Sequence, residues 1–218
     1  LWIADFTGMI DFGSGTSGYA RQYDNEDNST NIYWFIPNPR FQVYLVNDYI
    51  YGSQWTPNST VTASIDGIVK GSGKFDENGW GYIDINEEFV TGQVVSLTDG
   101  TYTRTHTVLD LAVTNVDTAS DIVTGRAEPG SELKRVSTFY EDDWYYLYPI
   151  TDGSGVWHAN FSGIADIIGG SYGWAVQADE NENETVFRWF APNPTIRVYP
   201  RYGEVYGIQW PSEADVTL

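Results

Sequence analysis

The sequence predicts an all-β protein built from antiparallel β-sandwiches in tandem, and three observations carry this prediction. First, residues 2–62 align with 157–217 at a constant offset of 155 without a gap, and 25 of the 61 aligned positions are identical. Second, the chain is rich in Trp (9), Tyr (16) and Phe (10), residues that suit half-buried strands. Third, we find no segment of ten or more residues that has the 3.6-residue period of an amphipathic helix.

Composition narrows the class of protein further. The 218-residue chain has a formal net charge of −19, so its surface repels nucleic acid and anionic membranes. It contains no Cys, which excludes disulfide and zinc–thiolate frameworks and is common in exported surface proteins. We find no membrane-spanning run and expect no membrane insertion. Because the chain opens inside a repeat, an export signal would lie outside this sequence.

The first segment, 1–40, opens in the middle of a domain. Its predicted elements follow in order: a strand at 2–6, a Gly/Ser loop at 11–18, and strands at 19–23 and 31–35 joined by the polar run 24–30. Through the repeat these strands match the late strands of a later segment. We therefore interpret 1–40 as the C-terminal part of a sandwich.

The second segment, 41–110, carries enough strands for a complete, shorter sandwich. The predicted strands are 41–45, 50–52, 61–65, 80–85, 94–97 and 101–108. The dipeptide Asp99-Gly100 predicts a hairpin turn between the last two strands. His106 lies in a Thr-rich alternating strand, and we expect its side chain on the solvated or rim side.

The third segment, 111–195, predicts a complete, longer sandwich, and 196–218 restarts the shorter type. The predicted strands of the third segment begin at 111 and 123 and continue at 132–139, 144–148, 156–161, 172–178 and 184–190. Six or seven short strands at regular spacing indicate an antiparallel sandwich. The last segment is then the N-terminal part of a further sandwich. A 155-residue, two-domain repeat results.

A Trp-Phe-x-Pro-Asn-Pro motif occurs once in each copy of the repeat. Proline cannot donate to a sheet ladder and holds the preceding residue extended, so the motif predicts a joint between consecutive domains. We expect the aromatic side chains of the motif to pack at the domain junctions. The predicted joint residues are Trp34, Phe35, Pro37, Asn38 and Pro39, and Trp189, Phe190, Pro192, Asn193 and Pro194.

Three short stretches suggest a family. The run Val123-Thr124-Gly125-Arg126-Ala127-Glu128-Pro129-Gly130-Ser131 resembles the opening of bacterial immunoglobulin-like domains from tandem-repeat surface proteins. The Asp-x-x-Gly-Trp pattern from Asp76 to Trp80 is similar to a later part of the same domains. The hairpin from Asp179 to Thr185 resembles their last hairpin, although Glu182 stands where Gly is usual. This resemblance implies tandem immunoglobulin-like antiparallel β-sandwiches and no catalytic residues.

The aromatic strand at 144–148 is the first candidate binding feature. Alternation places Trp144, Tyr146 and Tyr148 on one face and Tyr145 and Leu147 on the other, and only one face can belong to the core. The other face is expected to contact a neighbouring domain or subunit, or to stack on sugar rings. Burial of these rings between domains would favour the first alternative, and a flat exposed platform the second.

Two acidic hairpin tips are candidate Ca²⁺ sites, because Ca²⁺ takes six to eight oxygen ligands and each tip offers three carboxylates. The alternative is a solvated acidic turn. The candidate ligands are Asp24, Glu26 and Asp27 in one copy, and Asp179, Glu180 and Glu182 in the other. Asn28 and Asn183 lie in the same tips and fit the N-glycosylation acceptor pattern. We expect no other cofactor.

Together these features predict a non-enzymatic structural or adhesive module of an extracellular or cell-surface repeat protein, such as a filament, sheath or surface layer. The alternative is a carbohydrate-binding module that uses exposed aromatic side chains. The half-sandwiches at 1–40 and 196–218 expose apolar strands, so we expect partner strands from the rest of a longer chain or from another copy. The predicted partners are therefore copies of the chain itself, head to tail or by strand donation, and glycans.

Overall fold

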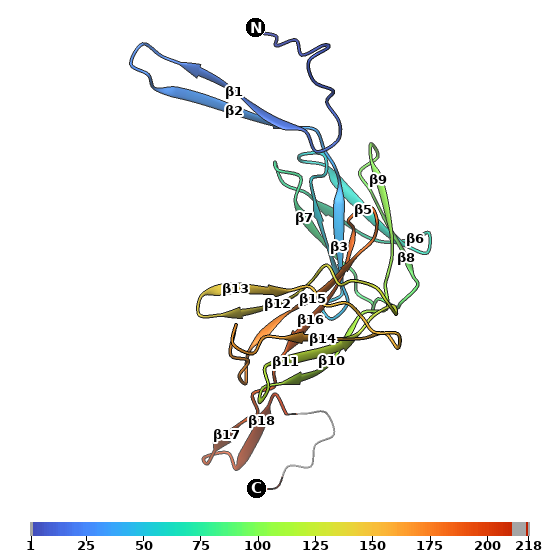
Figure 1. Cartoon of the computed structure of the whole chain (residues 1–218), viewed down its shortest axis with the longest axis vertical. Helices are drawn as coiled ribbons and strands as arrows, with labels where there is room; N and C mark the ends of the chain where they lie inside the picture. The colour runs from blue at the N-terminus through green and yellow to red at the C-terminus, as the bar shows by residue number, and fades with distance from the viewer. Residues whose placement is uncertain (1, 211–216, 218) are drawn as a thin grey trace.

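The computed structural model describes residues 2–210 and 217, and it confirms the all-β prediction (Figure 1). The described residues form 18 strands and no helix, so none of their elements is a helix long and apolar enough to cross a membrane. The strands assemble into two closed sandwiches with an exposed hairpin at either end. Buried and part-exposed side chains alternate along strands such as β3, β4 and β5, as expected when one face of each strand lies on a core.

The first sandwich closes around one apolar core. Its two sheets have the orders β3-β4-β7 and β6-β5-β8-β9. The strands are β3 (Arg40–Tyr44), β4 (Tyr49–Ser53), β5 (Thr60–Ile65), β6 (Ile68–Lys74), β7 (Gly81–Asp84), β8 (Val94–Thr98) and β9 (Thr103–Thr107). Trp55, Phe41 and Phe75 are the largest side chains in the core, and each is at most 1% exposed.

The second sandwich repeats the same arrangement of strands. Its sheets are β10-β11-β14 and β13-β12-β15-β16, so the first, second and fifth strands again face the other four. The strands are β10 (Ala112–Asp117), β11 (Ile122–Arg126), β12 (Arg135–Tyr140), β13 (Asp143–Leu147), β14 (Val156–Asn160), β15 (Tyr172–Ala178) and β16 (Glu184–Phe190). Trp157 and Phe161 are fully buried at the centre of its core.

Each sandwich has a glycine directly under a large aromatic ring of its core. A Cβ on Gly125 would lie 2.1 Å from the ring of Trp157, and a Cβ on Gly52 would lie 2.4 Å from the ring of Phe75. Both glycines belong to the second strand of their sandwich. The missing side chain lets a core aromatic lie directly on the strand, which accounts for the Tyr-Gly and Thr-Gly dipeptides at these positions.

The two sandwiches are joined by one parallel strand pair, which the sequence pattern did not predict. Strand β16 of the second sandwich pairs in parallel with β3 of the first, and this produces a continuous seven-stranded sheet in the order β13-β12-β15-β16-β3-β4-β7. All other strand pairs among the described residues are antiparallel. The expectation of purely antiparallel sandwiches in series is therefore corrected at this one pair.

Two hairpins lie at opposite ends of the molecule (Figure 1). They are β1 (Ser17–Tyr23) with β2 (Ser29–Phe35), and β17 (Thr195–Tyr199) with β18 (Glu204–Ile208). An offset of 155 carries the bounds of β1 and β2 onto those of β15 and β16, and the bounds of β3 and β4 onto those of β17 and β18. The two end segments do not pack on one another among the described residues.

Candidate functional site

The candidate site is the joint between the two complete sandwiches. Residues 184–186 of β16 lie opposite residues 42–44 of β3, and the Leu45 N–H donates to the Val186 carbonyl at 3.0 Å. This backbone ladder covers what would otherwise be the open edge of the first sandwich. A paired edge removes a template for unwanted strand addition and fixes the register between the two sandwiches.

The turn between β15 and β16 reaches into the joint, and together with the first two residues of β16 we call it the docking tip, residues 179–185. Its shape is set locally, because the Asp179 carboxylate accepts hydrogen bonds from the backbone N–H groups of Asn181 and Asn183 at 2.8 and 3.0 Å. Glu182 adopts a left-handed conformation with φ of 62°. An Asx turn of this kind presents the side chains of the tip in a fixed arrangement.

Asn183 ties the docking tip to two strands of the first sandwich. Its side chain is fully buried, its Oδ1 accepts from the Phe41 N–H at 3.2 Å, and its Nδ2 donates to the Thr105 carbonyl at 3.3 Å. Phe41 belongs to β3 and Thr105 to β9. Asn183 thus satisfies one donor and one acceptor of the neighbouring sandwich with a fully buried side chain, and a buried polar group without a partner is costly.

His106 forms the second contact of the docking tip. Its Nδ1 lies 2.8 Å from Asp179 Oδ2, and its Nε2 lies 2.8 Å from the Thr185 hydroxyl. That hydroxyl also accepts from the Leu109 N–H at 3.0 Å. The arrangement fits a neutral imidazole that donates from Nδ1 to the carboxylate and accepts at Nε2 from the hydroxyl. The sequence placed His106 on a solvated or rim face, and this was wrong, because the residue is 1% exposed.

Burial lowers the pKa of His106 below its ordinary value of 6.5, and the opposing effects of the Asp179 and Glu184 carboxylates are smaller. In the unfolded chain the imidazole has its ordinary pKa and binds more protons than the folded joint does. The contribution of neutral His106 is therefore fully present above about pH 6.5 and is lost as the pH falls through the lowered, folded pKa.

We expect the melting temperature of the wild-type chain to fall between about pH 6.5 and pH 5, because the buried imidazole must take up a proton. The same scan on the His106→Gln variant should be nearly flat over this window. His158 is exposed, so His158→Gln serves as the matched control and should retain the wild-type slope. A wild-type slope in the His106→Gln variant would contradict the assignment.

Charged side chains surround the buried part of the joint. Arg40 pairs with Glu182 at 2.7 Å, and Lys134 pairs with Glu184 at 2.8 Å. Glu184 also accepts from Gln42 across the parallel pair. The Arg40 pair is exposed and contributes little stability, whereas Glu184 is only 7% exposed and depends on its partners.

The Trp-Phe-x-Pro-Asn-Pro motif is distributed between core and surface. Trp189 is buried in the core of the second sandwich, whereas Phe190 is 55% exposed, and Trp34 and Phe35 are half-buried. In the first copy, Arg104 donates to the Pro39 carbonyl at 2.9 Å and lies 3.5 Å from the Asn38 side chain. In the second copy, the Asn193 N–H donates to Gln209 at 3.3 Å. Pro37 is half-buried, whereas Pro192 and Pro194 are exposed.

The outer face of the seven-stranded sheet is aromatic. Trp144 and Trp174 stack at 4.6 Å between ring centroids, and Tyr172 meets Trp174 edge to face at 6.3 Å. The Arg188 guanidinium lies 6.0 Å from the Tyr172 centroid. A second cluster of Tyr44, Tyr49, Tyr51 and Tyr82 lies on the three strands from the first sandwich. Tyr146 and Tyr148 are 47% and 63% exposed, so the predicted aromatic strand is not buried between the sandwiches.

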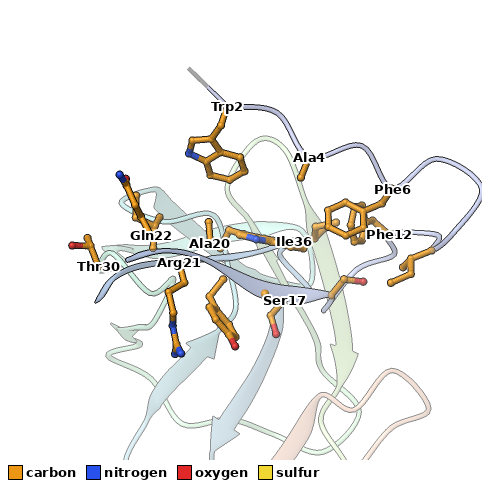
Figure 2. Close-up of a pocket in the computed structure, with 16 residues that line it drawn as sticks. Trp2, Ala4, Phe6, Phe12, Ser17, Ala20, Arg21, Gln22, Thr30 and Ile36 are labelled. Atoms are coloured by element: carbon orange, nitrogen blue, oxygen red, sulfur yellow. The ribbon is translucent and has the colours of Figure 1, made fainter. Parts of the chain in front are cut away.

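The N-terminal segment forms an open apolar hollow of about 1140 Å³ (Figure 2). Figure 2 shows Trp2, Ala4 and Phe6 on the segment that runs beside the hairpin, with Ala20 directed toward them. Eight of the residues that line the hollow correspond, at the offset of 155, to core residues of the second sandwich; they are Trp2, Ala4, Phe6, Ile10, Phe12, Ala20, Trp34 and Ile36. The hollow is therefore one half of a sandwich core.

Among the residues that the structure describes, none covers the N-terminal hollow as the other half of that core does in the second sandwich. In the second sandwich it consists of Leu111, Val123, Ala127, Leu133 and Val136, which belong to the first three strands and their loops. Trp2 is 65% exposed as a result, whereas its counterpart Trp157 is fully buried. The lining of the hollow thus matches one half of a strand-built core.

The acidic tips have local roles in the structure. Asp24 and Asp179 accept hydrogen bonds within their own turns, and Asp179 also contacts His106. Within residues 2–210, no group of three or more His, Asp or Glu side chains could hold a metal ion. Ca²⁺ binding by Asp24, Glu26, Asp27, Asp179, Glu180 and Glu182 stays a prediction. Asn28 is exposed, but the burial of Asn183 contradicts a glycan on its side chain.

Sequence reasoning missed the residues of the joint, although the repeat contains a signal for them. Only three of the seven tip positions are identical in the two copies: Asp24 with Asp179, Asn28 with Asn183, and Thr30 with Thr185. These are the three docking-tip residues that contact buried groups of the first sandwich. Identity limited to contact positions could have indicated an interface before the structure was known.

No protein-family model and no curated protein matches the chain. Among solved structures, it is similar to "Biofilm associated protein - BSP domain", with 12% identity and a TM-score of 0.28, over 70% of this chain and 29% of that one. A second is "Structural insight into host cell surface retention of a 1.5-MDa bacterial ice-binding adhesin" (14% identity, TM-score 0.25, 80% and 73%). A third is "Crystal structure of tetra-tandem repeat in extending region of large adhesion protein" (13%, 0.28, 85% and 58%). The TM-scores are too low to support an argument about function.

Proposed function

We propose that the chain is a non-enzymatic structural and adhesive module of an extracellular repeat protein, of the kind that builds a filament, sheath or surface layer. The observation that carries this proposal is the joint, in which a parallel strand pair and a buried polar contact unite two closed cores. A unit of this kind resists bending between its sandwiches. Its repetition at an offset of 155 residues suits a long, load-bearing rod.

The surface is consistent with this role. The net charge of −19 favours solubility, and it repels nucleic acid and anionic lipid. A chain without Cys tolerates an oxidising environment outside the cell. The N-terminal hollow corresponds to half of a core, and the buried His106 is used in the joint. These features favour mechanical work at a cell surface.

In this proposal the two kinds of joint have different stiffness. Between the sandwiches of one repeat, the ladder and the docking tip hold the geometry. Between repeats, the Pro-Asn-Pro element links the chain through few hydrogen bonds. Proline restricts the backbone there without a ladder.

Replacing Pro37 and Pro192 with Gly is expected to increase flexibility between repeats without unfolding either sandwich, because glycine removes the restriction on φ. Small-angle scattering should show a broader distribution of distances, with the melting temperature unchanged. The matched control is Pro129→Gly, in an exposed turn within one sandwich, which should leave the scattering profile unaltered. An unchanged profile after the double replacement would count against this joint.

Carbohydrate binding is the second candidate function, and exposure of the aromatic outer face favours it. The indole stack of Trp144 and Trp174 lies on a sheet face with Arg188 and Tyr146 nearby. Aromatic faces can stack on sugar rings while neighbouring polar groups bond to hydroxyls.

For this second function, Trp174→Ala should weaken binding to a neutral polysaccharide by about tenfold or more, corresponding to about 1.4 kcal/mol of lost stacking. Affinity electrophoresis in gels that contain cellulose, chitin or amylose derivatives measures the effect. Trp2 is exposed at the N-terminal hollow and is not part of this aromatic face, so Trp2→Ala is the control. Equal mobility of wild type and both variants in every gel would reject carbohydrate binding by this face.

A further inference from the structure

The N-terminal hairpin carries a second copy of the docking tip. Strands β1 and β2 pair in the register of β15 and β16, from Ser17 opposite Phe35 to Tyr23 opposite Ser29. Its turn is built alike, because Asp24 accepts from the N–H groups of Glu26 and Asn28 at 2.9 Å. Asp27 has φ of 64°, close to the 62° of Glu182. The hairpin therefore reaches the docked shape without being docked.

The tip of this hairpin has kept the contact residues of the joint. Asp24, Asn28 and Thr30 stand where Asp179, Asn183 and Thr185 contact the first sandwich, whereas the other four tip positions differ. In the docked copy Glu182 pairs with Arg40, and Asp27 supplies a carboxylate at the same position in the free copy. The free tip thus has both the buried contact groups and the peripheral charge.

Thr30 distinguishes residues kept for an interface from residues kept only for the shape of the turn. Asp24 and Asn28 also shape the turn, since the Asn28 amide donates to Asp24 Oδ2 at 3.1 Å. The Thr185 hydroxyl, by contrast, bonds only to His106 and the Leu109 N–H, both in the neighbouring sandwich. Thr30 is exposed, and its hydroxyl makes no hydrogen bond to any residue that the structure describes. A threonine that the turn does not use is accounted for by an interface.

The partner surface is defined by what the docked copy touches. It consists of the edge of a β3-type strand, which offers the Phe41 N–H. The β9-type strand adds the Thr105 carbonyl and the His106 imidazole, and the segment after it adds the Leu109 N–H. We call this set the acceptor edge. In this chain the docking tip 179–185 occupies it, so the hairpin 24–30 must find an acceptor edge elsewhere.

We propose that the tip of the β1–β2 hairpin docks on another sandwich of the 41–110 type, one whose acceptor edge is vacant. Strand β2 then pairs in parallel with the β3-type strand, with Ser29 opposite Gln42 and Thr30 opposite Val43, as residues 184 and 185 are now. Thr30 and Asp24 bind the imidazole from either side, and Asn28 bridges the backbone of the two acceptor strands. This deepens the proposed structural role by naming the partner of the hairpin.

Vacating the acceptor edge in the chain itself tests the proposal. The Asp179→Ala/Asn183→Ala/Thr185→Ala variant loses its own docking contacts but keeps the hairpin tip, so its copies should associate. Sedimentation equilibrium should show an average mass at least twice that of the wild-type chain at the same concentration. Adding Thr30→Ala should restore the wild-type mass. Adding Asn25→Ala, at a tip position that differs between copies, should leave the association intact.

A disulfide arm keeps the test sound if the triple variant fails to fold. The chain has no cysteine, so Ser29→Cys with Gln42→Cys in the milder Asn183→Ala background, which loosens the chain's own docking tip, can report on docking between copies. Oxidation should give a ladder of multimers on a non-reducing gel. The control pairs Ser29→Cys with Tyr51→Cys, one strand further from the acceptor edge, and should give a much weaker ladder.

Three results would overturn the proposal: a triple variant that folds with the wild-type mass at every concentration, association that persists after Thr30→Ala, or equal ladders from both cysteine pairs. None of these measures stiffness at the Pro-Asn-Pro element. Failure here therefore leaves the scattering test of the proposed function standing, and failure there does not decide the role of the hairpin.

Discussion

Replacing Trp157 with alanine is expected to lower the free energy of unfolding of the second sandwich by about 3–5 kcal/mol. The indole is fully buried and lies on Gly125, which has no side chain to fill the cavity from the strand beneath the ring. Denaturant unfolding followed by far-ultraviolet circular dichroism measures the effect. The first sandwich has its own core, so its transition should remain.

The repeat supplies the control for this prediction. Trp2 is the same residue at the equivalent position, but it is 65% exposed over the N-terminal hollow. Trp2→Ala should change the free energy of unfolding by less than about 0.5 kcal/mol. A cost for Trp2→Ala that matched the cost for Trp157→Ala would mean that the hollow is filled in solution.

Replacing Asn183 with alanine is expected to cost about 1–3 kcal/mol, because it removes the partner of the buried Phe41 N–H and of the part-buried Thr105 carbonyl. This loss of free energy should weaken the coupling between the two sandwiches and leave each core intact. In calorimetry, we expect one shared transition in the wild-type chain and two separated transitions in the variant.

Asn28→Ala is the matched control, since Asn28 shapes the same turn but is exposed. It should leave the calorimetric transitions within about 0.5 kcal/mol of wild type. If Asn183→Ala and Asn28→Ala gave equal shifts, the effect would belong to the turn and the joint would hold no special role for the amide.

The strands and cores could be predicted from the sequence because they follow local rules. Alternation along 41–45 and 61–65 puts Phe41, Val43, Val61, Ala63 and Ile65 on one face, and all of them are buried. Equal spacing of strands and turns then favours a sandwich. The segment Ile68–Lys74 was missed as a strand because its Gly and Lys residues break the alternation, although it pairs along β5 at the edge of the sheet.

The joint could not be predicted in the same way. Its contacts lie 73 to 142 residues apart in sequence, and a parallel pair between two sandwiches leaves no local period. The Thr-rich alternation around His106 suggested a solvated strand, and burial by the neighbouring sandwich reversed this. The aromatic strand was more informative, since Tyr145 and Leu147 pack on the core while Trp144 and Tyr146 lie on the outer face.

The two complete sandwiches are expected to move as one body, and residual dipolar couplings measure this. Backbone couplings from the cores of 41–110 and 111–195, measured in one weakly aligning medium, should fit a single alignment tensor with equal magnitude and axes. The continuous sheet and the buried docking tip require this result. Two tensors of different magnitude would show that the sandwiches reorient independently, and the account of a stiff two-sandwich unit would be wrong.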